Sequence, residues 1–289
     1  MRAQETEPQP RLAVIVTCHE EGPLVLDAVK SIQEPEPVEI VVIDDASRDD
    51  ATHRTLDRIE EEEGVRVIRL EQNRGVAHAR MTGFAETSAP LVVPLDGDDL
   101  LEPGVLSEMA GRLDATPDAA ACVGDILEFG DREVLRAVPE RLDPYRVAYT
   151  NEYPITAVFR RARLEEVDGW RRPQTAQQGY EDWGLWMDIA ERGWPIAHLG
   201  PRRVSYRRRL HGRRLNHQAR EHHREIYRTL RASHPQLFAD LPEHRRRSDL
   251  SGVRKILYPV VYGERARVPF EDVLKPIADR FGIWTLTRH

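Results

Sequence analysis

Four short apolar runs occupy the first third of the chain, and residues with helical spacing separate them. The runs cover residues 11–17, 38–43, 65–70 and 91–95. They recur about every 27 residues, and the stretches between them carry apolar residues at intervals of three and four, near 24–32, 49–62 and 76–85. Strands that alternate with helices in this way predict βαβ units and a parallel sheet flanked by helices. Right-handed crossovers would bring the carboxyl ends of all four strands to one edge of that sheet.

The pattern becomes less regular after Pro103. It predicts strands at 119–129, 134–138, 155–159, 195–199 and 203–206. It predicts helices at 105–113, at 161–167 and around 185–189. The stretch from Pro139 to Pro154 is expected to be irregular. Ser47 and Asp49 are candidate N-caps for the helix that ends near Glu62.

The character of the chain changes near Asn216. Apolar residues at helical spacing predict two amphipathic helices, one with Leu215, Ala219, Ile226 and Leu230 and one with Phe270, Val273, Leu274, Ile277 and Phe281. Between Arg202 and Arg247 fourteen arginines stand against four acidic residues, so this segment is strongly basic. We therefore expect a disordered polar tail over 1–10, an α/β domain over 11–215, and a basic helical extension over 216–289.

Composition narrows the function classes. The 289 residues are 40% apolar and 31% charged, which is typical of a soluble globular protein, and a net charge of −7 gives no case for nucleic-acid binding. Cys18 and Cys122 form no CxxC pattern, which argues against a disulfide framework and against a cysteine-built zinc site. No apolar stretch approaches the ~18 residues of a membrane span, and the polar N-terminus does not read as a signal peptide. We expect a cytoplasmic protein that would meet a membrane only at its inner face.

Acidic residues follow two of the predicted strands. Asp44 and Asp45 follow the second strand, and Asp96, Asp98 and Asp99 follow the fourth. Ligands of open α/β sheets gather at this edge. Three neighbouring carboxylates repel one another unless a cation lies among them, and a hard divalent ion such as Mn²⁺ or Mg²⁺ suits them. The alternatives are an acidic loop that caps the next helix and the DxD of dehalogenase-type phosphatases, which normally follows the first strand of its domain.

Two further groups carry candidate chemistry. Glu181 and Asp182 stand at a predicted helix start beside Trp183. A carboxylate there can deprotonate a hydroxyl, and an aromatic face can hold a sugar ring, although one of the acids could simply cap the helix. The basic run 206–211 offers arginines for a diphosphate and His211 as a ligand for a metal or phosphate.

The order of these motifs resembles that of the family-2 glycosyltransferases, which have the GT-A fold. The similar segments are Thr17-Cys-His-Glu-Glu21, Val41-Val-Ile-Asp-Asp-Ala-Ser47, Asn73-Arg-Gly75 with Ala79-Arg80, Leu95-Asp-Gly-Asp-Asp99 and Glu181-Asp-Trp-Gly-Leu-Trp186. The resemblance spans roughly Leu12 to His211. The chain departs from the family pattern at two places. Residues Cys18–Glu20 stand where the family often has a Tyr-Asn or Asn-Glu pair, and Met81 stands where it often has Asn. The resemblance implies a GT-A, Rossmann-like, mostly parallel sheet followed by a mainly helical extension.

The resemblance also implies a reaction. A sugar would move from a nucleotide-diphospho-sugar, with a UDP-sugar favoured, to an acceptor hydroxyl with inversion of configuration. Carried over position by position, the nucleotide-sugar site would comprise Thr17, His19, Glu20, Asp45, Arg80 and Asp96. The metal, Mn²⁺ or Mg²⁺, would be held by Asp98, Asp99 and His211. Asp182, or alternatively Glu181, would be the general base that takes the hydroxyl proton.

Other readings stay open. A metal-dependent nucleotidyltransferase also uses a Rossmann-like sheet, but its first strand would be followed by a basic Gly-rich loop, where this chain has Glu20-Glu-Gly-Pro23. A nucleotide-sugar-binding or membrane-docking module without turnover is the non-enzymatic alternative. The acceptor could be a saccharide, a lipid-linked molecule or a small molecule. The basic segment could contact an anionic membrane, cover the acceptor site, form a homo-oligomer contact, or simply pack on the domain.

Overall fold

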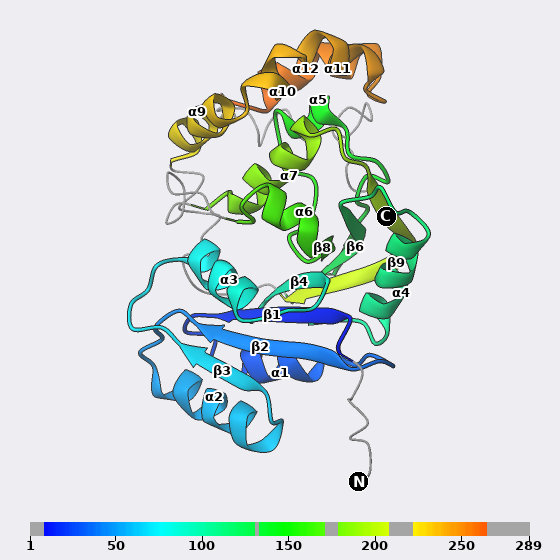
Figure 1. Ribbon diagram of the computed structural model, residues 1–289. Helices are drawn as coiled ribbons and strands as arrows, with labels where there is room; N and C mark the ends of the chain where they lie inside the picture. Colours follow the sequence, from blue (N-terminus) through cyan, green and yellow to red (C-terminus); the bar gives the residue numbers. More distant parts are fainter. Residues whose placement is uncertain (1–8, 131–132, 171–178, 208–221, 265–289) are drawn as a thin grey trace.

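One mixed sheet forms the centre of the molecule. The computed structural model describes residues 9–130, 133–170, 179–207 and 222–264. Within these residues nine strands pair in the order β3-β2-β1-β4-β8-β6-β9-β5, with β7 paired to β6 (Figure 1). The four strands of the N-terminal half are β1 (Leu12–Cys18), β2 (Val38–Asp44), β3 (Arg66–Arg69) and β4 (Leu91–Asp96). All four run parallel, so the prediction of a parallel sheet from the apolar runs is confirmed.

Helices cover both faces of this parallel half. They are α1 (Leu24–Lys30) and α2 (Asp50–Glu62) on one face and α3 (Val76–Ala85) on the other (Figure 1). Neighbouring residues of β1 enter different cores, because Ile15 packs on the side of α3 and Val16 on the side of α1 and α2. Burial on both faces explains why β1 is continuously apolar in the sequence instead of alternating.

One of the two predicted N-caps is confirmed. Asp49 caps α2, since its side chain accepts the N–H of Thr52 at 2.7 Å. Ser47 does not cap the helix. Its hydroxyl donates to Asp44 and accepts the N–H of Glu20, so it joins the loop after β2 to the loop after β1. The prediction of Ser47 as a cap was wrong because a partner distant in sequence takes its side chain.

The second half of the sheet is mixed. Its elements are β5 (Asp99–Leu101), α4 (Val105–Asp114), β6 (Ala121–Phe129), β7 (Val134–Arg136), α5 (Pro144–Val147), β8 (Val158–Arg160), α6 (Arg161–Glu166), α7 (Glu181–Glu191) and β9 (Ile196–Arg207). The two strands predicted at 195–199 and 203–206 are in fact one strand, β9. Its pairing with β6 shifts between Val123 and Asp125, and this irregularity accommodates Gly200, whose φ is 87°.

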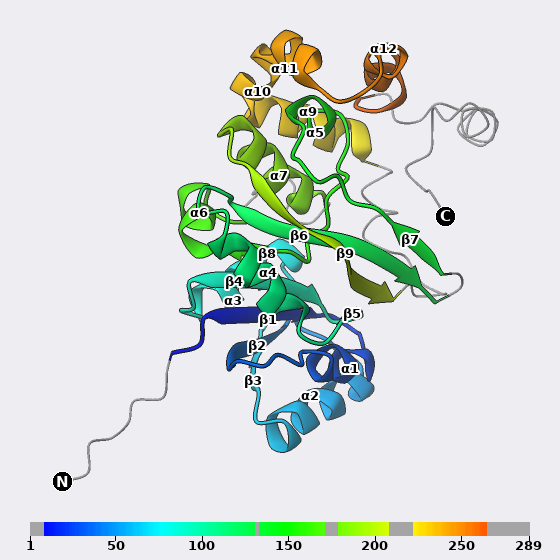
Figure 2. The same cartoon turned by 90° about the vertical axis from the view of Figure 1, so that its right-hand side faces the viewer.

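Strand β9 connects the centre of the sheet to the edge where β4 ends. Its first residues pair parallel to β6, with Ile196 opposite Ala121. Its last residues pair antiparallel to β5, with Tyr206 opposite Asp99 (Figure 2). The start of the basic run is therefore beside the acidic turn that follows β4. The sequence pattern of separate short strands did not reveal this connection.

The C-terminal region is mainly helical over the residues that are described. It comprises α9 (His223–Ser233), α10 (Pro235–Ala239), α11 (Leu241–Arg247) and α12 (Gly252–Val261), which lie over α5 and α7 (Figures 1 and 2). Ile226 and Leu230 of α9 are buried, as their spacing predicts. The remaining predicted apolar positions of this region, Leu215, Ala219 and those between Phe270 and Phe281, lie outside the described residues, as do residues 1–8 of the predicted tail. Across the described ranges, every helix is too short or too polar to cross a bilayer.

Candidate active site

The carboxyl ends of β1, β2 and β4 meet along one rim of the sheet. The strand register sets Thr17 of β1 opposite Ile43 of β2 and opposite Asp96 of β4. The Thr17 hydroxyl donates to the Asp96 carboxylate across 3.3 Å. Asp45 follows the last residue of β2 and is held to β1, because its N–H donates to the Cys18 carbonyl at 2.8 Å. This rim brings together residues that are up to 79 positions apart in the chain.

The turn after β4 lies directly against the end of β1. The Gly97 N–H donates to the Thr17 carbonyl oxygen at 2.8 Å. A Cβ atom on Gly97 would lie 2.8 Å from that same oxygen, which is closer than a carbon and a backbone oxygen can approach. Glycine is therefore required at this position by the close approach of two backbones. The acidic residues on either side of it, Asp96 and Asp98, are fixed relative to β1 as a result.

Asp45 organises the loop that precedes α3. The residue is 4% exposed, and its two carboxylate oxygens accept the N–H groups of Arg74 and Gly75 at 2.9 and 2.7 Å. Hydrogen bonds from two consecutive backbone amides hold the start of α3 against the end of β2. This structural use leaves each carboxylate oxygen a second lone pair that can accept a further hydrogen bond.

Two further residues of the predicted nucleotide pocket, His19 and Glu20, lie in the loop after β1. Glu20 accepts the N–H of Arg48 at 2.8 Å and has a φ of 61°, in the left-handed region that favours glycine. A non-glycine residue in that conformation is strained and persists where its surroundings hold it in place. The ring nitrogen Nε2 of His19 lies 2.9 Å from the amide nitrogen of Asn73, in the loop before α3. The loops after β1, β2 and β3 are thus tied into a single rim.

Arg80 links this rim to α7. Its guanidinium is 2% exposed and donates to Asp96 at 2.7 Å and to Glu181 at 2.6 Å. Burial by itself would lower the pKa of Arg80, but the charges of Asp96 and Glu181 outweigh burial and raise it above its ordinary value. The side chain is therefore a permanently charged bridge between the end of β4 and the start of α7.

The two adjacent acids at the start of α7 have different environments. Glu181 is 6% exposed and forms the ion pair with Arg80. Asp182 is only partly buried, and its oxygens accept the N–H of Trp183 and the side-chain amide of Asn151, both at 2.8 Å. Burial, followed by the charge of Glu181, raises the pKa of Asp182 to about 7. A carboxylate with such a pKa is suited to accept a proton at neutral pH.

A comparison with protein families decides the classification. The model of the family described as Glycosyl transferase family 2 matches residues 13–188, which is more than half of the chain. The chain belongs to this family. Among curated relatives, the succinoglycan biosynthesis protein ExoU of Rhizobium meliloti (strain 1021) is 30% identical over 135 residues, which cover 46% of this chain and 38% of ExoU. An N-acetylglucosaminyltransferase of Azorhizobium caulinodans is 29% identical over 123 residues, covering 41% of this chain and 31% of that protein. The aligned parts are well under half of either relative.

Solved structures confirm the GT-A glycosyltransferase fold that the resemblance implies. S. aureus TarS 1-349 in complex with UDP-GlcNAc superposes with a TM-score of 0.62 at 18% identity, covering 95% of this chain and 78% of that one. The mannosyltransferase PcManGT from Pyrobaculum calidifontis in complex with GDP-Man and Mn²⁺ gives 0.56 at 18% identity, covering 97% and 85%. At such identities the similarity concerns the fold alone.

The candidate metal ligands lie where β4 turns into β5. Asp98 is in the turn and Asp99 is the first residue of β5, both are partly exposed, and Asp99 pairs with Tyr206 of β9. Among the described residues, there is no group of three or more His, Cys, Asp or Glu side chains that could hold a metal ion. The two carboxylates nevertheless fit Mn²⁺ or Mg²⁺, because such ions take other ligands from substrate phosphates and water. His211, the third predicted ligand, lies outside the described residues.

Trp183 is not available to hold a sugar ring, so that expectation was wrong. The side chain is 3% exposed, and its indole N–H donates to the Val147 carbonyl at 2.7 Å. His223 and Tyr227 of α9 cover it, with ring centroids 6.2 and 5.6 Å away. The tryptophan therefore attaches α7 to the C-terminal helices instead of facing the acceptor.

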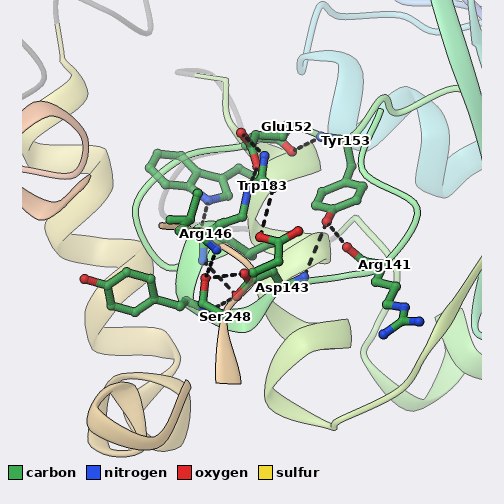
Figure 3. Close-up of polar contacts among 12 residues, drawn as sticks. Arg141, Asp143, Arg146, Glu152, Tyr153, Trp183 and Ser248 are labelled. Atoms are coloured by element: carbon green, nitrogen blue, oxygen red, sulfur yellow. Dashed lines mark hydrogen bonds and ion pairs between the residues drawn. The ribbon is translucent and has the colours of Figure 1, made fainter. Parts of the chain in front are cut away.

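A buried polar network lies behind α7 and includes a segment that the sequence analysis did not recognise. Arg146 of α5 makes a bidentate salt bridge to Glu152, with bonds of 2.5 and 2.7 Å (Figure 3). Asp143 caps α5 and accepts the hydroxyl of Ser248, which follows α11, at 2.6 Å. The same segment carries Asn151, the partner of Asp182. Since no motif marks residues 143–153, only the long-range contacts of the structure identify this part of the site.

The structure groups the predicted site residues into two connected sets. The first is the bonded chain of Thr17, Asp96, Arg80 and Glu181, with Asp182 next to it. The second is the rim formed by the loops that hold His19, Glu20 and Asp45. Asp98, in the turn after β4, and Asp99, the first residue of β5, follow Asp96 of the first set closely in the chain.

Proposed function

We propose that the protein transfers a sugar from a nucleotide-diphospho-sugar to an acceptor hydroxyl with inversion, and that Asp182 is the general base. The observation that carries the proposal is the position of Asp182 at the start of α7, where burial and the charge of Glu181 raise the pKa of this partly buried residue to about 7. It stands next to Glu181, which Arg80 ties to Asp96 at the end of β4. Glu181 is engaged by Arg80, so Asp182 is the better candidate for the base.

The reaction is one displacement. Asp182 accepts the proton of the acceptor hydroxyl. At the same time the hydroxyl oxygen attacks C1 of the sugar, and the nucleoside diphosphate leaves from the opposite face. Attack from the face opposite the leaving group inverts the anomeric centre. Mn²⁺ or Mg²⁺ held by Asp98 and Asp99 would supply positive charge for the departing diphosphate. Arg80 keeps Asp96 and Glu181 in place during the reaction without exchanging a proton, because guanidinium stays charged in proteins.

The donor side is the rim around β1 and β2. Thr17, His19, Glu20 and Asp45 would line the nucleotide, with Asp45 toward the base and Asp96 toward the ribose. TarS binds UDP-GlcNAc and PcManGT binds GDP-Man, which supports a nucleotide-sugar donor, and we favour a UDP-sugar. The acceptor is a saccharide, a lipid-linked molecule or a small molecule.

The assay must separate transfer from the alternatives. The protein is incubated with Mn²⁺, candidate acceptors, and UDP-GlcNAc, UDP-glucose or GDP-mannose, and release of nucleoside diphosphate is followed. Transfer gives nucleoside diphosphate and a product whose anomeric configuration, read from its ¹H NMR coupling, is opposite to that of the donor. A nucleotidyltransferase would release pyrophosphate from a nucleoside triphosphate, and a binding module would show a thermal shift with a donor but no release.

Variants then assign the roles. Asp182→Asn should keep the thermal shift caused by the donor but lose transfer by 10²-fold or more. Asp98→Ala should lose transfer and also the dependence on Mn²⁺. Near-normal transfer by Asp182→Asn would exclude that residue as the base, and full activity of Asp98→Ala in excess chelator would exclude the metal site.

A peripheral membrane contact is part of the proposal, and α12 is the surface that would make it. Val253, Ile256 and Val260 lie at helical spacing and are 60%, 62% and 58% exposed. The preceding helix ends in the exposed arginines 245–247. Apolar side chains beside clustered cations are typical of helices that lie on anionic lipid. The charge favours lipid over a second copy of this basic surface.

Co-sedimentation tests this contact. The protein should pellet with vesicles of phosphatidylglycerol but not with phosphatidylcholine, and high salt should weaken the binding. Val253→Ser/Ile256→Ser should reduce it at equal folding stability. If the protein instead sedimented as a dimer that dissociates on dilution, and did not bind vesicles, the surface would be assigned to a homo-oligomer.

A further inference from the structure

Asn151 makes a direct contact with the proposed base. It lies between α5 and β8, and its amide nitrogen Nδ2 is 2.8 Å from Oδ2 of Asp182. The other carboxylate oxygen, Oδ1, accepts the N–H of Trp183 at 2.8 Å. Among the described residues, each oxygen of Asp182 therefore has one donor. Two bonds from different elements fix the plane of the carboxylate as well as its position.

The orientation of the Asn151 amide follows from its second contact. Its oxygen Oδ1 accepts the backbone N–H of Tyr153 at 3.0 Å. If the amide were turned over, its NH₂ group would face that N–H, and its oxygen would face the Asp182 carboxylate. Both contacts would then be repulsive, so the nitrogen must point to Asp182. The Asn151 amide therefore donates to Asp182, because this orientation satisfies both of its contacts.

The segment that carries Asn151 is anchored by the two residues that follow it. Glu152, the next residue, forms the bidentate salt bridge with Arg146 (Figure 3). The Tyr153 hydroxyl donates to the Arg141 carbonyl at 2.6 Å (Figure 3). The salt bridge is buried and the tyrosine bond is partly buried, and their partners lie outside the site, so Asn151 is held on an anchored segment.

We propose that Asn151 is a positioning residue for the general base, in that its amide sets the direction in which the unshared lone pairs of the Asp182 carboxylate point. The proposal rests on the proposed function. In the reaction the acceptor proton moves to Asp182, the bond from the acceptor oxygen to C1 forms, and the bond from C1 to the diphosphate oxygen breaks. Asn151 gives up no proton and makes no contact with the reacting carbon.

The charges around Asp182 explain why a neutral donor suits this place. Glu181 of α7 and Asp96 of β4 are negative, and Arg80 of α3 is positive. A cation at the position of Asn151 would stabilise the carboxylate strongly and make it a weak base. An amide orients the carboxylate and leaves it basic enough to take a proton at neutral pH.

The decisive variant is Asn151→Asp, which has nearly the same shape. One of its oxygens still accepts the Tyr153 N–H, so the local turn is kept. The other oxygen faces Oδ2 of Asp182 without a donor and adds a negative charge. We expect kcat to fall about tenfold to a hundredfold with an unchanged KM for the donor, and the acid limb of the kcat–pH profile to move up by about one unit.

The control in the same segment is Tyr153→Phe. It removes the hydroxyl bond to Arg141 but keeps the backbone N–H that orients Asn151. This variant should lower thermal stability and leave the acid limb in place. An equal shift of the limb in Tyr153→Phe would mean that general loosening of the segment, and not the Asn151 donor, changes the base.

A direct measurement separates this proposal from the proposed function. The carboxyl carbon of Asp182 is titrated by ¹³C NMR in protein labelled at aspartate, with Asp182→Asn identifying the signal. Asn151→Asp should raise the midpoint of this titration and Tyr153→Phe should not, even if wild-type protein transfers no sugar in the assay. A wild-type kcat and an unchanged titration in Asn151→Asp would overturn the role of Asn151.

Discussion

Removing Arg80 tests the bridge between the two halves of the site. In Arg80→Met the carboxylate of Glu181, which is 6% exposed, loses a cation 2.6 Å away. Leaving one member of a buried ion pair without its partner costs about 3–5 kcal/mol of unfolding free energy. Asp96 loses the same cation, but its side chain is 36% exposed and water can solvate it. Methionine replaces much of the apolar stem, so we expect most of the loss to come from Glu181.

The double variant Arg80→Met/Glu181→Gln identifies the cause. It removes both charges, and the buried amide of Gln is far less costly than an unpaired carboxylate. We expect it to recover at least about 2 kcal/mol of the loss, measured as a coupling energy in a double-mutant cycle. The four proteins are compared by guanidinium chloride denaturation at pH 7.5, followed by circular dichroism. A loss below about 1 kcal/mol in Arg80→Met, or a double variant as unstable as the two single losses added together, would refute the reasoning.

The remaining predictions concern the base and the acidic turn. Asp182 accepts a proton only when ionised and its pKa is about 7, so kcat should fall about tenfold per pH unit below that value; a flat profile from pH 5 to 7 at saturating donor would contradict the assignment. Glu181→Gln should move this limb to lower pH, because the Glu181 charge is one cause of the raised pKa of Asp182, and the same kinetic profile measures it. Gly97→Ala should cost about 1–3 kcal/mol and weaken donor binding, since the new Cβ would lie 2.8 Å from the Thr17 carbonyl oxygen; unchanged stability by denaturation and unchanged donor affinity by calorimetry would show that the turn is more adaptable than its geometry implies.

The rim at the ends of β1, β2 and β4, which is the proposed donor side, could be anticipated from the sequence because its determinants are local. Strand β1 is buried on both faces, so it reads as one apolar run, and parallel pairing follows from the alternation with helices. The acids Asp45 and Asp96 then fall at strand ends that must share an edge. The strand register confirms that arrangement, since Thr17 pairs with Ile43 and with Asp96.

The proposed acceptor side, around the start of α7, could not be anticipated because its determinants are distant in the chain. Trp183 is buried because Tyr227, which lies 44 positions later in the chain, covers it. Asn151 acquires its role from Asp182, 31 residues away, in a stretch without periodicity. The four-residue helix α5 exists because Asp143 caps it and because Ser248 binds that cap. Local patterns contain none of this information.

The backbone hydrogen bond between Gly97 and Thr17 affects how substitutions can change the two halves of the proposed site. It belongs to the backbone, so the acidic turn is in effect an extension of the sheet and hardly depends on which side chains surround it. The base side is attached differently, through side-chain bonds such as those of Asn151 and Ser248. Substitutions can therefore reshape the proposed acceptor half while the backbone of the proposed donor half stays constant. A nucleotide that binds such a preformed platform needs little ordering of the protein, which leaves its binding energy available for holding the sugar in place.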